Sequence, residues 1–588
     1  MNEGQFGARL TPDGASFRLW APAAKRVDLL LDKAQPMRRG EDGWFSADIS
    51  GVKAGARYKY RIDDEIDVPD PASTFQPEDV SGPSEIIDHL SYRWRASDWR
   101  GRPWQETVLI ETHLGAFTRE GTYRAMSSKL DHLKAAGITA LELMPVADFA
   151  GSRNWGYDGV LWYAPDSVYG RPDDLKALID EAHLRGLMVF LDVVYNHFGP
   201  EGNYLGRYAP SFFTEAQTPW GSAIDYRVRE VRAFAIENAL YWLREYRFDG
   251  LRLDAVHAIS EPGEISMLGD LSRAVGTLAA ETNRHIHLVL ENDDNAASLL
   301  DSNHERPRGK YRAQWNDDYH HAWHVLLTGE SHGYYRDYQR SPLRDIARAL
   351  GSGFVYQGEA SLHRGGQLRG EPSDKLAPTA FVSFLQNHDQ IGNRALGDRL
   401  ESVADSKAVE AALAITLLAP MVPMLFMGEE WGSKRAFPFF CDFHGDLAEA
   451  VRKGRRKEFA GADARHGDEI PDPLAQSTFQ SAVLDWQSRN QPAGKKRLAL
   501  VQQLLATRQR EIVPRLAGAA FGNAQAADNG LLTASWRLGD GATLVLTANL
   551  SNREIAHQRS EASGTRIWGG ETGDLMPPWS VFWRLEAR

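Results

Sequence analysis

Short apolar runs alternate with helical stretches through the middle of the chain. From Thr107 onward, eight segments are apolar enough to form buried strands, and segments with helical periodicity, such as Pro172–Arg185 and Arg229–Tyr246, intervene. A strand followed by a helix, repeated eight times, predicts an α/β fold of the (β/α)8 TIM-barrel type, with functional residues at the C-terminal ends of the strands. The predicted strands are Thr107–Leu114, Ala140–Pro145, Met188–Val193, Gly250–Asp254, His287–Leu290, Tyr311–Trp315, Phe381–Gln386 and Met421–Met427.

The two ends of the chain follow a different pattern. The N-terminal part alternates short β-rich segments, such as Ala15–Trp20 and Ala56–Ile62, with Pro, Gly and Asp turns, which predicts a β-sandwich. After the barrel, Lys495–Leu516 has the pattern of an amphipathic helix, and Leu531–Leu585 returns to short β segments. We therefore expect an N-terminal β-sandwich at residues 1–90, a barrel with loop insertions at 91–516 and a small C-terminal β-domain at 517–588.

Composition limits the possible partners. A chain of 588 residues is too long for one hydrophobic core, so several domains are expected. The net charge of −12 and an isoelectric point near 5.9 offer no broad basic surface, which argues against nucleic acid or an anionic membrane as a partner. The longest apolar run, Ala411–Met427, contains Pro420 and Pro423 and predicts a buried helix and strand rather than a membrane span. With Cys441 as the single cysteine and no apolar export signal near Met1, we expect a cytoplasmic protein, and a monomer.

Three carboxylates follow three of the predicted strands. Glu291 comes directly after the apolar run His287–Leu290, and Asp389 lies where a later apolar run ends. Asp254 ends another strand, in which period-two alternation puts Arg252 and Asp254 on one face. Because the C-terminal ends of barrel strands meet at the same face of the barrel, we expect the three acids to form one site.

Paired carboxylates suggest the cleavage of a glycosidic bond. This reaction needs one protonated acid to donate to the leaving oxygen and one ionised acid to attack or stabilise the sugar cation. Arg252 favours the ionised form of Asp254, whereas the apolar residues before Glu291 favour its protonated form, so Asp254 is the candidate nucleophile and Glu291 the candidate acid. Each acid taken alone is more often a strand-end cap or one half of an ion pair. The three together favour a catalytic site.

Four ordered segments resemble the signature regions of the α-amylase superfamily of retaining glycosidases. They are Asp192–His197 (DVVYNH), Gly250–Asp254 (GLRLD), Glu291 and Asn387–Asp389 (NHD). The resemblance implies that Asp254 is the nucleophile, Glu291 the acid/base and Asp389 the residue that stabilises the distorted sugar ring. Other residues are expected to contact the sugar, either because the resemblance implies this role or because they lie beside the matched motifs. They are Tyr157, Asp158, His197, Arg252, His257, Asn316, Asp317, Asp318, His320, His388, Gln390 and Asn393.

The face of Tyr157 is physically suited to a sugar ring, since it offers apolar area in a fixed plane. The alternative is a purely structural role, in which Trp155 and Tyr157 anchor the loop by packing in the core.

Further segments are similar to one family within this superfamily, the maltooligosyltrehalose trehalohydrolases. These segments are Phe17–Pro22 (FRLWAP), Val68–Phe75 (VPDPASTF), Arg153–Tyr163, Asp192–Tyr204, Gln314–His321 (QWNDDYHH), Asn387–Leu400 and Met424–Trp431 (MLFMGEEW). The resemblance implies an enzyme that cleaves the α-1,4 bond between a maltooligosaccharide and a terminal trehalose, with maltooligosyltrehalose synthase as its functional partner. It also makes Asn316–His320 a substrate loop. The sequence departs from this pattern at Phe437–Phe443 (FPFFCDF), which leaves the role of that loop open.

The histidines in and after this loop could suggest a metal site. His320, His321 and His324 lie close to Asp317 and Asp318 in the sequence, and His320 and His324, four residues apart, would face one side of a helix. Asn196 lies where many amylases bind calcium, but one amide does not fix a cation. We expect no metal and no required cofactor.

Two other functions are compatible with parts of this pattern. A glucan-branching or debranching enzyme would share the sandwich, the barrel and the acids. A catalytically inactive carbohydrate-binding protein would share the fold, but the presence of Asp254, Glu291 and Asp389 argues against it.

Overall fold

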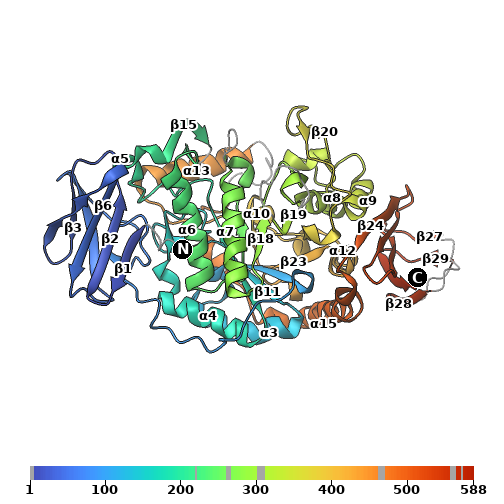
Figure 1. Cartoon of the computed structure of the whole chain (residues 1–588). Coiled ribbons are helices and arrows are strands. Elements are labelled where there is room, and N and C mark those ends of the chain that lie inside the picture. Colours follow the sequence, from blue (N-terminus) through green and yellow to red (C-terminus); the bar gives the residue numbers. More distant parts are fainter. Residues whose placement is uncertain are drawn as a thin grey trace.

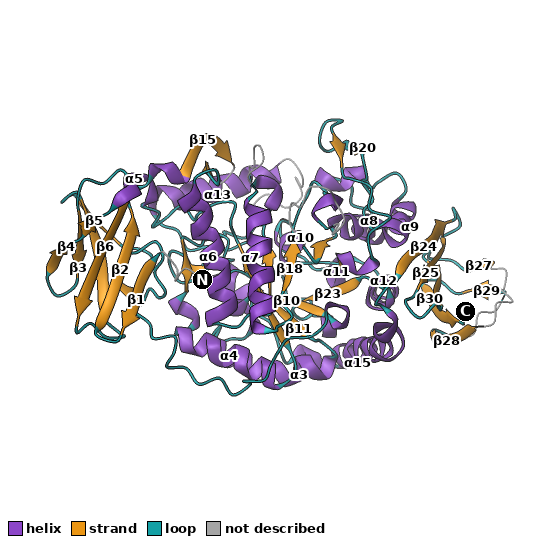
Figure 2. Ribbon diagram, in the orientation of Figure 1, coloured by secondary structure: helices purple, strands orange, loops and turns teal. Residues whose placement is uncertain are grey.

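The computed structural model describes residues 6–218, 221–259, 266–300, 311–460, 470–556, 564–570 and 574–587. Figure 1 shows three parts in a row, with an N-terminal β-rich part at one end, a barrel in the centre and a C-terminal β-sheet at the other end. Helices surround the strands of the central part only, whereas the two ends are built mainly from strands (Figure 2).

Eight parallel strands close into the central barrel, and each lies within or overlaps a strand predicted from the sequence. The predicted barrel is therefore confirmed. In barrel order the strands are β10 (Leu109–Thr112), β11 (Ala140–Leu143), β14 (Met188–Val193), β17 (Gly250–Leu253), β18 (His287–Leu290), β19 (Ala313–Trp315), β22 (Phe381–Ser383) and β23 (Val422–Phe426).

Alternation along the strands separates the barrel interior from the helix layer. Residues such as Met188, Phe190 and Val289 fill the interior, while Leu191 and Leu251 belong to the core beneath the helices. The longer helices of this layer are α4 (Pro172–Leu184), α6 (Arg229–Glu245), α7 (Met267–Thr282) and α12 (Ser406–Leu418). No helix in the described ranges is both long enough and apolar enough to cross a lipid bilayer.

The N-terminal part is a sandwich of two antiparallel sheets, as predicted. Phe17 and Leu19 from one sheet and Leu29 and Tyr60 from the other are all buried in its core. One sheet contains β1 (Gly7–Thr11), β2 (Gly14–Trp20), β6 (Trp44–Ser50) and β5 (Arg38–Arg39), and the other contains β4 (Ala34–Pro36), β3 (Val27–Leu30), β7 (Arg57–Ile62), β8 (Ile66–Val68) and β9 (Ser84–Glu85).

The C-terminal part is an antiparallel sheet that packs on the barrel domain through α9 (Pro342–Ser352), where the indole of Trp536 donates to the carbonyl of Leu350 at 2.9 Å. Its strands are β24 (Ala520–Ala526), β25 (Leu531–Arg537), β26 (Thr543–Asn549), β30 (Ser580–Glu586) and β28 (Gly564–Trp568). The limits 1–90, 91–516 and 517–588 remain our proposal for the three domains.

The helix predicted at Lys495–Leu516 is shorter than expected. The α-helical part, α15, spans Pro492–Thr507 and is followed by a π-helical turn at Arg508–Ile512. There the buried guanidinium of Arg508 donates to the carbonyls of Leu417 and Met421, so a contact with a distant segment changes the helix geometry.

An insertion between β19 and β22 builds one wall above the barrel. It contains α8 (Asp317–Thr328), a short helix η7 (Gly333–Asp337), α9, and a hairpin of β20 (Glu359–Ala360) and β21 (Leu368–Arg369). The segment Asn316–His320, predicted as a loop, is instead the start of α8, and the Asn316 side chain caps the helix by accepting from the Tyr319 amide at 3.3 Å. The polar residues that suggested a loop are a helix N-terminus.

Candidate active site

The three predicted acids lie at the same end of the barrel. Asp254 follows β17 and Glu291 follows the adjacent strand β18, whose register pairs Leu253 with Leu290. The Glu291 amide donates to the Leu253 carbonyl at 3.0 Å, so the hydrogen bonding between the two strands continues to Glu291. Asp389 lies in α10 (His388–Gly392), which begins after β22.

A single arginine holds this constellation together. Arg252 is 1% exposed, and its guanidinium donates to Asp254 Oδ1 at 2.9 Å and to Glu291 Oε2 at 2.7 Å. It also donates to Asp192 Oδ2 at 2.6 Å and lies 4.1 Å from the centre of the Trp315 ring. The planar guanidinium therefore fixes the positions of three carboxyl groups from three neighbouring strands.

The environments of the two candidate catalytic acids differ. Burial raises the pKa of Glu291, and the nearby Asp254 carboxylate raises it further, while Arg252 lowers it. The amide of Ala255, whose backbone has a left-handed φ of 41°, donates to Glu291 at 2.9 Å. Asp254 accepts a hydrogen bond from the side-chain amide of Asn196 at 2.8 Å, in addition to the hydrogen bond from Arg252. The pKa of Glu291 is thus raised above its ordinary value, which favours the protonated form that a proton donor needs.

Asp389 lies in a pair with the histidine before it. Burial raises the pKa of Asp389, although His388 opposes this shift, and Asn393 Nδ2 donates to Asp389 Oδ1 at 2.7 Å. Burial acts to lower the pKa of His388, but the carboxylates of Glu111, from β10, and of Asp389 act to raise it, and the pKa is raised overall. The His388 amide also donates to Glu111 at 2.9 Å, which fixes the start of α10.

Tyr157 lies beside these groups. Its hydroxyl donates to Asp192 Oδ2 at 2.6 Å, and its ring stacks on His388 with centroids 4.9 Å apart. His197 contacts the Tyr157 carbonyl through Nε2 at 2.9 Å, and Asn154 donates to Asp158 at 2.6 Å. The geometry brings Tyr157, His197 and His388 together around the acids.

The aromatic loop Phe437–Phe443, left without a role by the sequence, packs behind this group. Phe437 stacks on Trp155 at 5.6 Å, and Trp155 meets His388 edge-on at 5.4 Å. Trp155 is therefore a core anchor, as the alternative interpretation held for it, whereas Tyr157 is only half-buried and contacts the polar cluster. The loop supports the position of His388.

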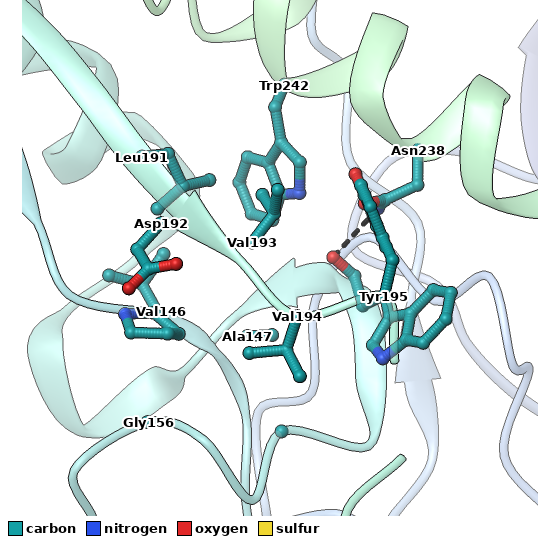
Figure 3. Close-up of a pocket in the computed structure, with 13 residues that line it drawn as sticks. Val146, Ala147, Gly156, Leu191, Asp192, Val193, Val194, Tyr195, Asn238 and Trp242 are labelled. Carbon is teal, nitrogen blue, oxygen red and sulfur yellow. Dashed lines mark hydrogen bonds between the residues drawn. The ribbon is translucent and has the colours of Figure 1, made fainter. Parts of the chain in front are cut away.

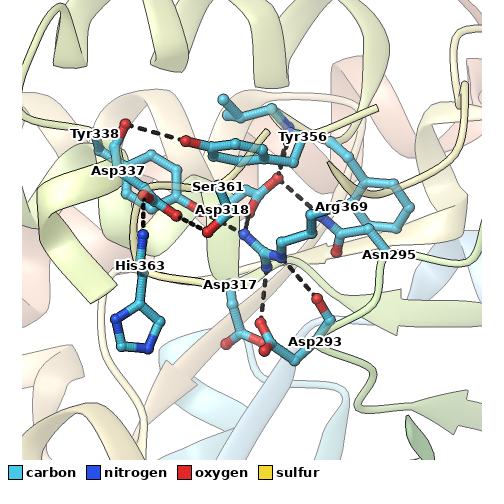
Figure 4. A network of polar contacts seen from close by, with 12 residues as sticks. Asp293, Asn295, Asp317, Asp318, Asp337, Tyr338, Tyr356, Ser361, His363 and Arg369 are labelled. Carbon is cyan, nitrogen blue, oxygen red and sulfur yellow. Dashed lines mark hydrogen bonds and ion pairs between the residues drawn. The ribbon is translucent and has the colours of Figure 1, made fainter. Parts of the chain in front are cut away.

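A pocket of about 220 Å³ opens beside Glu291 and Asp389, and we call it the catalytic pocket. Its wall is polar and comes mainly from the insertion between β19 and β22. Several of the lining residues, such as Asp293, Asp317 and Arg369, are drawn in Figure 4. Residues predicted from the sequence that line it, besides the two acids, are His257, Asp317 and Gln390. Lining residues that sequence reasoning did not select include Asp293, His321, Tyr334, His363, Arg364 and Arg369.

The other predicted residues of the α8 segment do not line this pocket. Asn316, Asp318 and His320 are all buried, and their polar atoms have partners inside the protein. His320 contacts the Leu385 carbonyl at 2.6 Å and the Tyr335 hydroxyl at 3.0 Å, and Asn316 donates to the Gly353 carbonyl at 2.9 Å. Helix α8 thus turns these three side chains toward the protein interior rather than into the catalytic pocket. Their contact with a sugar stays a prediction.

Asp318 is the centre of a buried network that reaches the pocket. It accepts from Arg369 Nη1 at 2.8 Å, from Asn295 at 2.9 Å and from the amides of Val355 and Tyr356 at 2.7 and 2.9 Å. Arg369 in turn donates to the Asp293 carbonyl at 2.7 Å, and Figure 4 shows this chain of contacts. The network fixes the segment that follows Glu291.

A smaller cavity of about 20 Å³ lies behind Asp192 and is shown in Figure 3. Apolar side chains such as Val146 and Trp242 line most of it, and Tyr195 donates to Asn238 at 2.7 Å. The volume suits one water molecule and excludes a sugar ring.

Asn196 and Glu111 are the main contributors that were not selected from sequence. Asn196 lies inside the segment DVVYNH, where its sequence position suggests only a calcium ligand, whereas its amide donates to the Asp254 carboxylate at 2.8 Å. Glu111 lies within the predicted strand Thr107–Leu114, and its contact with His388 joins residues 277 positions apart in the sequence. Within the described ranges, no three His, Cys, Asp or Glu side chains converge so as to hold a metal ion. His324 instead contacts Glu330 at 2.8 Å.

Comparison with known families matches three regions of the chain. Residues 5–74 match carbohydrate-binding module 48, the isoamylase N-terminal domain. Residues 90–220 match the α-amylase catalytic domain, and residues 519–583 match a domain of unknown function.

Several curated relatives extend over most of the chain. A malto-oligosyltrehalose trehalohydrolase from Deinococcus radiodurans is 41% identical, over 87% of this chain and 84% of that protein. Another from Saccharolobus solfataricus is 40% identical, over 82% and 83%. A 1,4-α-glucan branching enzyme from Pseudoalteromonas atlantica is 34% identical, over only 43% of this chain and 40% of its own.

Solved structures show the same architecture. A candidate α-amylase from Salmonella typhimurium superimposes with a TM-score of 0.93 and 45% identity, covering 99% of this chain and 100% of that one. A pullulanase variant from Paenibacillus barengoltzii, solved with maltotetraose, gives a TM-score of 0.73 at 20% identity, over 100% of this chain and 96% of its own, and shares the fold.

Proposed function

The chain belongs to the maltooligosyltrehalose trehalohydrolases of the α-amylase superfamily, and we propose that it hydrolyses the α-1,4 bond between a maltooligosaccharide and a terminal trehalose, releasing trehalose. The observation that carries this proposal is the position of Arg252 between Asp254 and Glu291 at the ends of adjacent strands. The family assignment supplies the substrate, and the geometry supplies the chemistry.

The reaction proceeds in two steps with retention at the cleaved carbon. Glu291 donates its proton to the glycosidic oxygen as the C1–O bond breaks, and Asp254 attacks C1 to form a glycosyl ester while trehalose leaves. In the second step the Glu291 carboxylate takes a proton from water, which attacks C1 and displaces Asp254. The protonated acid is restored, and the maltooligosaccharide leaves as the α anomer.

Other residues hold the sugar during these steps. Asp389 and His388 lie beside the catalytic pair, where hydrogen bonds to ring hydroxyls would strengthen as the ring distorts. Tyr157 presents a ring face beside the same position. Arg252 keeps the nucleophile and the acid in fixed orientation, since it donates to both.

The catalytic pocket lies on the leaving-group side, because Glu291 lines it and Asp254 does not. We assign the trehalose end of the substrate to this pocket. Its lining of carboxyl, imidazole, amide and guanidinium groups suits a ligand that presents hydroxyls in every direction. Of the residues predicted from the sequence, His257, Asp317 and Gln390 line this pocket, and we expect them to contact trehalose there.

The cellular setting completes the proposal. A maltooligosyltrehalose synthase would supply the substrate, so this enzyme would act second in a two-enzyme route to trehalose. We propose that it works as a cytoplasmic monomer, which agrees with a single cysteine, Cys441, that is buried. No cofactor enters the steps above.

Product analysis tests the proposal against its rivals. Purified protein is given maltotriosyltrehalose or amylopectin, and the products are separated by chromatography. Maltotriose plus trehalose from the first substrate is the expected result. Glucosyl transfer, or shortened branches from amylopectin, would favour a branching or debranching enzyme. Binding without turnover of either substrate would favour a carbohydrate-binding protein.

A further inference from the structure

A second pocket adjoins the catalytic pocket, and we call it the side pocket. Tyr334 lines both pockets and forms the wall between them. The side pocket has a volume of about 490 Å³, larger than the catalytic pocket and within the range of about 300–1,000 Å³ that holds small molecules. The mechanism above uses none of this space.

The rings that line the side pocket are held in place by neighbours. Phe459 is 7% exposed, and the guanidinium of Arg455 lies 4.8 Å from its ring centre. Tyr334 packs against the rings of His321 and Tyr335, each with centroids 4.6 Å away. A fixed ring face offers apolar area to the C–H face of a pyranose with little loss of entropy.

The polar groups of the side pocket are also oriented before any ligand binds. Arg394 and Glu330 form a two-point ion pair, with Nη2 donating to Oε1 at 3.0 Å. Such a pair holds a donor and an acceptor in fixed directions. A sugar hydroxyl can both donate and accept, so this lining suits a neutral polyol.

The side pocket also touches the segment that carries a catalytic acid. Asn393 lines the pocket, and its amide donates to Asp389 at 2.7 Å. Arg455 donates to Asn393 Oδ1 at 3.1 Å, and Tyr334 donates to Gln390 at 2.9 Å. A ligand in the side pocket would therefore contact residues that position Asp389 and the wall of the catalytic pocket.

We propose that the side pocket is a second binding site for an α-glucoside, distinct from the position where the bond is cleaved. The fixed rings, the oriented ion pair and the shared wall with the catalytic pocket all point to this ligand class. The choice of a glucoside rests on the proposed function. Two sources are possible, the glucan arm of a substrate molecule and free trehalose product, and they share the chemistry of linked glucopyranoses.

Titration calorimetry tests the proposal. Glu291→Gln protein, which should not turn over its ligands, is titrated separately with maltotetraose and with trehalose. The same titrations are done after adding Ala395→Trp, which places a bulky ring at a half-buried alanine of the side pocket. Ala526→Trp is the matched control, because Ala526 is a half-buried alanine lining a pocket of about 390 Å³ beside the C-terminal sheet.

The expected result is two sites per chain for one of the sugars in the Glu291→Gln protein. Adding Ala395→Trp should leave one site, whereas adding the control Ala526→Trp should leave both. A second site for maltotetraose assigns the glucan arm, and one for trehalose assigns the product. If Ala395→Trp does not fold, Val403→Trp fills the same pocket. One site for each sugar in the Glu291→Gln protein would overturn the proposal, as would two sites that persist in a folded pocket-filling variant. Turnover of maltotriosyltrehalose by wild-type protein is measured in parallel, so that failure of the proposed function is recognised separately.

Discussion

Arg252 donates a hydrogen bond to Glu291 at 2.7 Å. It therefore contacts the candidate acid as well as Asp254, the candidate nucleophile, to which it donates at 2.9 Å. Sequence alternation had placed Arg252 beside Asp254 only. The extra contact lowers the pKa of Glu291 against the larger upward effect of burial. Arg252 thereby limits how far the pKa of the acid rises.

Loss of Arg252 should therefore shift the pH profile. Arg252→Met removes the cation that lowers the pKa of Glu291, so this pKa should rise. Glu291 must be protonated to act, so the basic limb of kcat/KM should move to higher pH. The rate should fall roughly 10²-fold or more, because oriented electrostatic contacts are lost. Arg252→Lys keeps the charge and should shift the limb less. A basic limb that stays in place or moves down in an active Arg252→Met variant would contradict this assignment.

The two carboxylates should be individually indispensable. Asp254→Asn removes the nucleophile and Glu291→Gln removes the proton donor, so each should lower kcat by roughly 10³-fold or more while the fold is retained. Asp294→Asn is the matched control, because Asp294 is exposed near the same segment and pairs with Arg364. Nuclear magnetic resonance of wild-type products should show the α anomer of maltotriose first, as retention requires. An initial β anomer would rule out Asp254 as a nucleophile.

A buried acid in the N-terminal sandwich should make stability depend on pH. Burial raises the pKa of Asp70 to about 6, although Tyr58, Tyr60 and the Ala72 amide donate to it. Because the folded pKa exceeds the unfolded value near 3.9, stability present below pH 4 is lost as pH rises toward 6, by about 3 kcal/mol. Asp70→Asn cannot titrate there. Its stability relative to wild type should increase between pH 4 and pH 7 in thermal unfolding of the full chain. A difference independent of pH would mean that Asp70 does not change its protonation in this range.

The strands and the acids could be predicted because both depend on local sequence. A buried barrel strand must be apolar, so the run His287–Leu290 identifies β18, and the acid at its C-terminal end, where a catalytic residue is expected, is Glu291. The same local argument placed Asp254 after β17. These positions needed no knowledge of the residues that surround them.

The α8 segment shows where local sequence was insufficient. Asn316 followed by Asp317 and Asp318 looks like a polar loop, but these residue types also begin helices. Which of the two aspartates turns inward depends on Arg369, 51 residues further along the chain. Neither the composition nor the spacing of the sequence reveals that contact. The sequence therefore gives Asp317 and Asp318 the same predicted role, contact with the sugar.

Those two adjacent aspartates should now respond differently to mutation. Asp317 lines the catalytic pocket, and burial, followed by Glu291 and Asp293, raises its pKa, so it can offer a neutral carboxyl to a hydroxyl of trehalose. Asp317→Ala should lower kcat/KM on maltotriosyltrehalose roughly tenfold more than on maltopentaose, because the trehalose contact alone is lost. Asp317→Asn should retain most of the wild-type kcat/KM on maltotriosyltrehalose. Asp318→Asn instead weakens the buried partner of Arg369, so it should lower the melting temperature and affect both substrates alike. Equal losses on the two substrates for Asp317→Ala would place the reading of trehalose elsewhere in the catalytic pocket, while a selective loss for a stable Asp318→Asn protein would reverse the two roles.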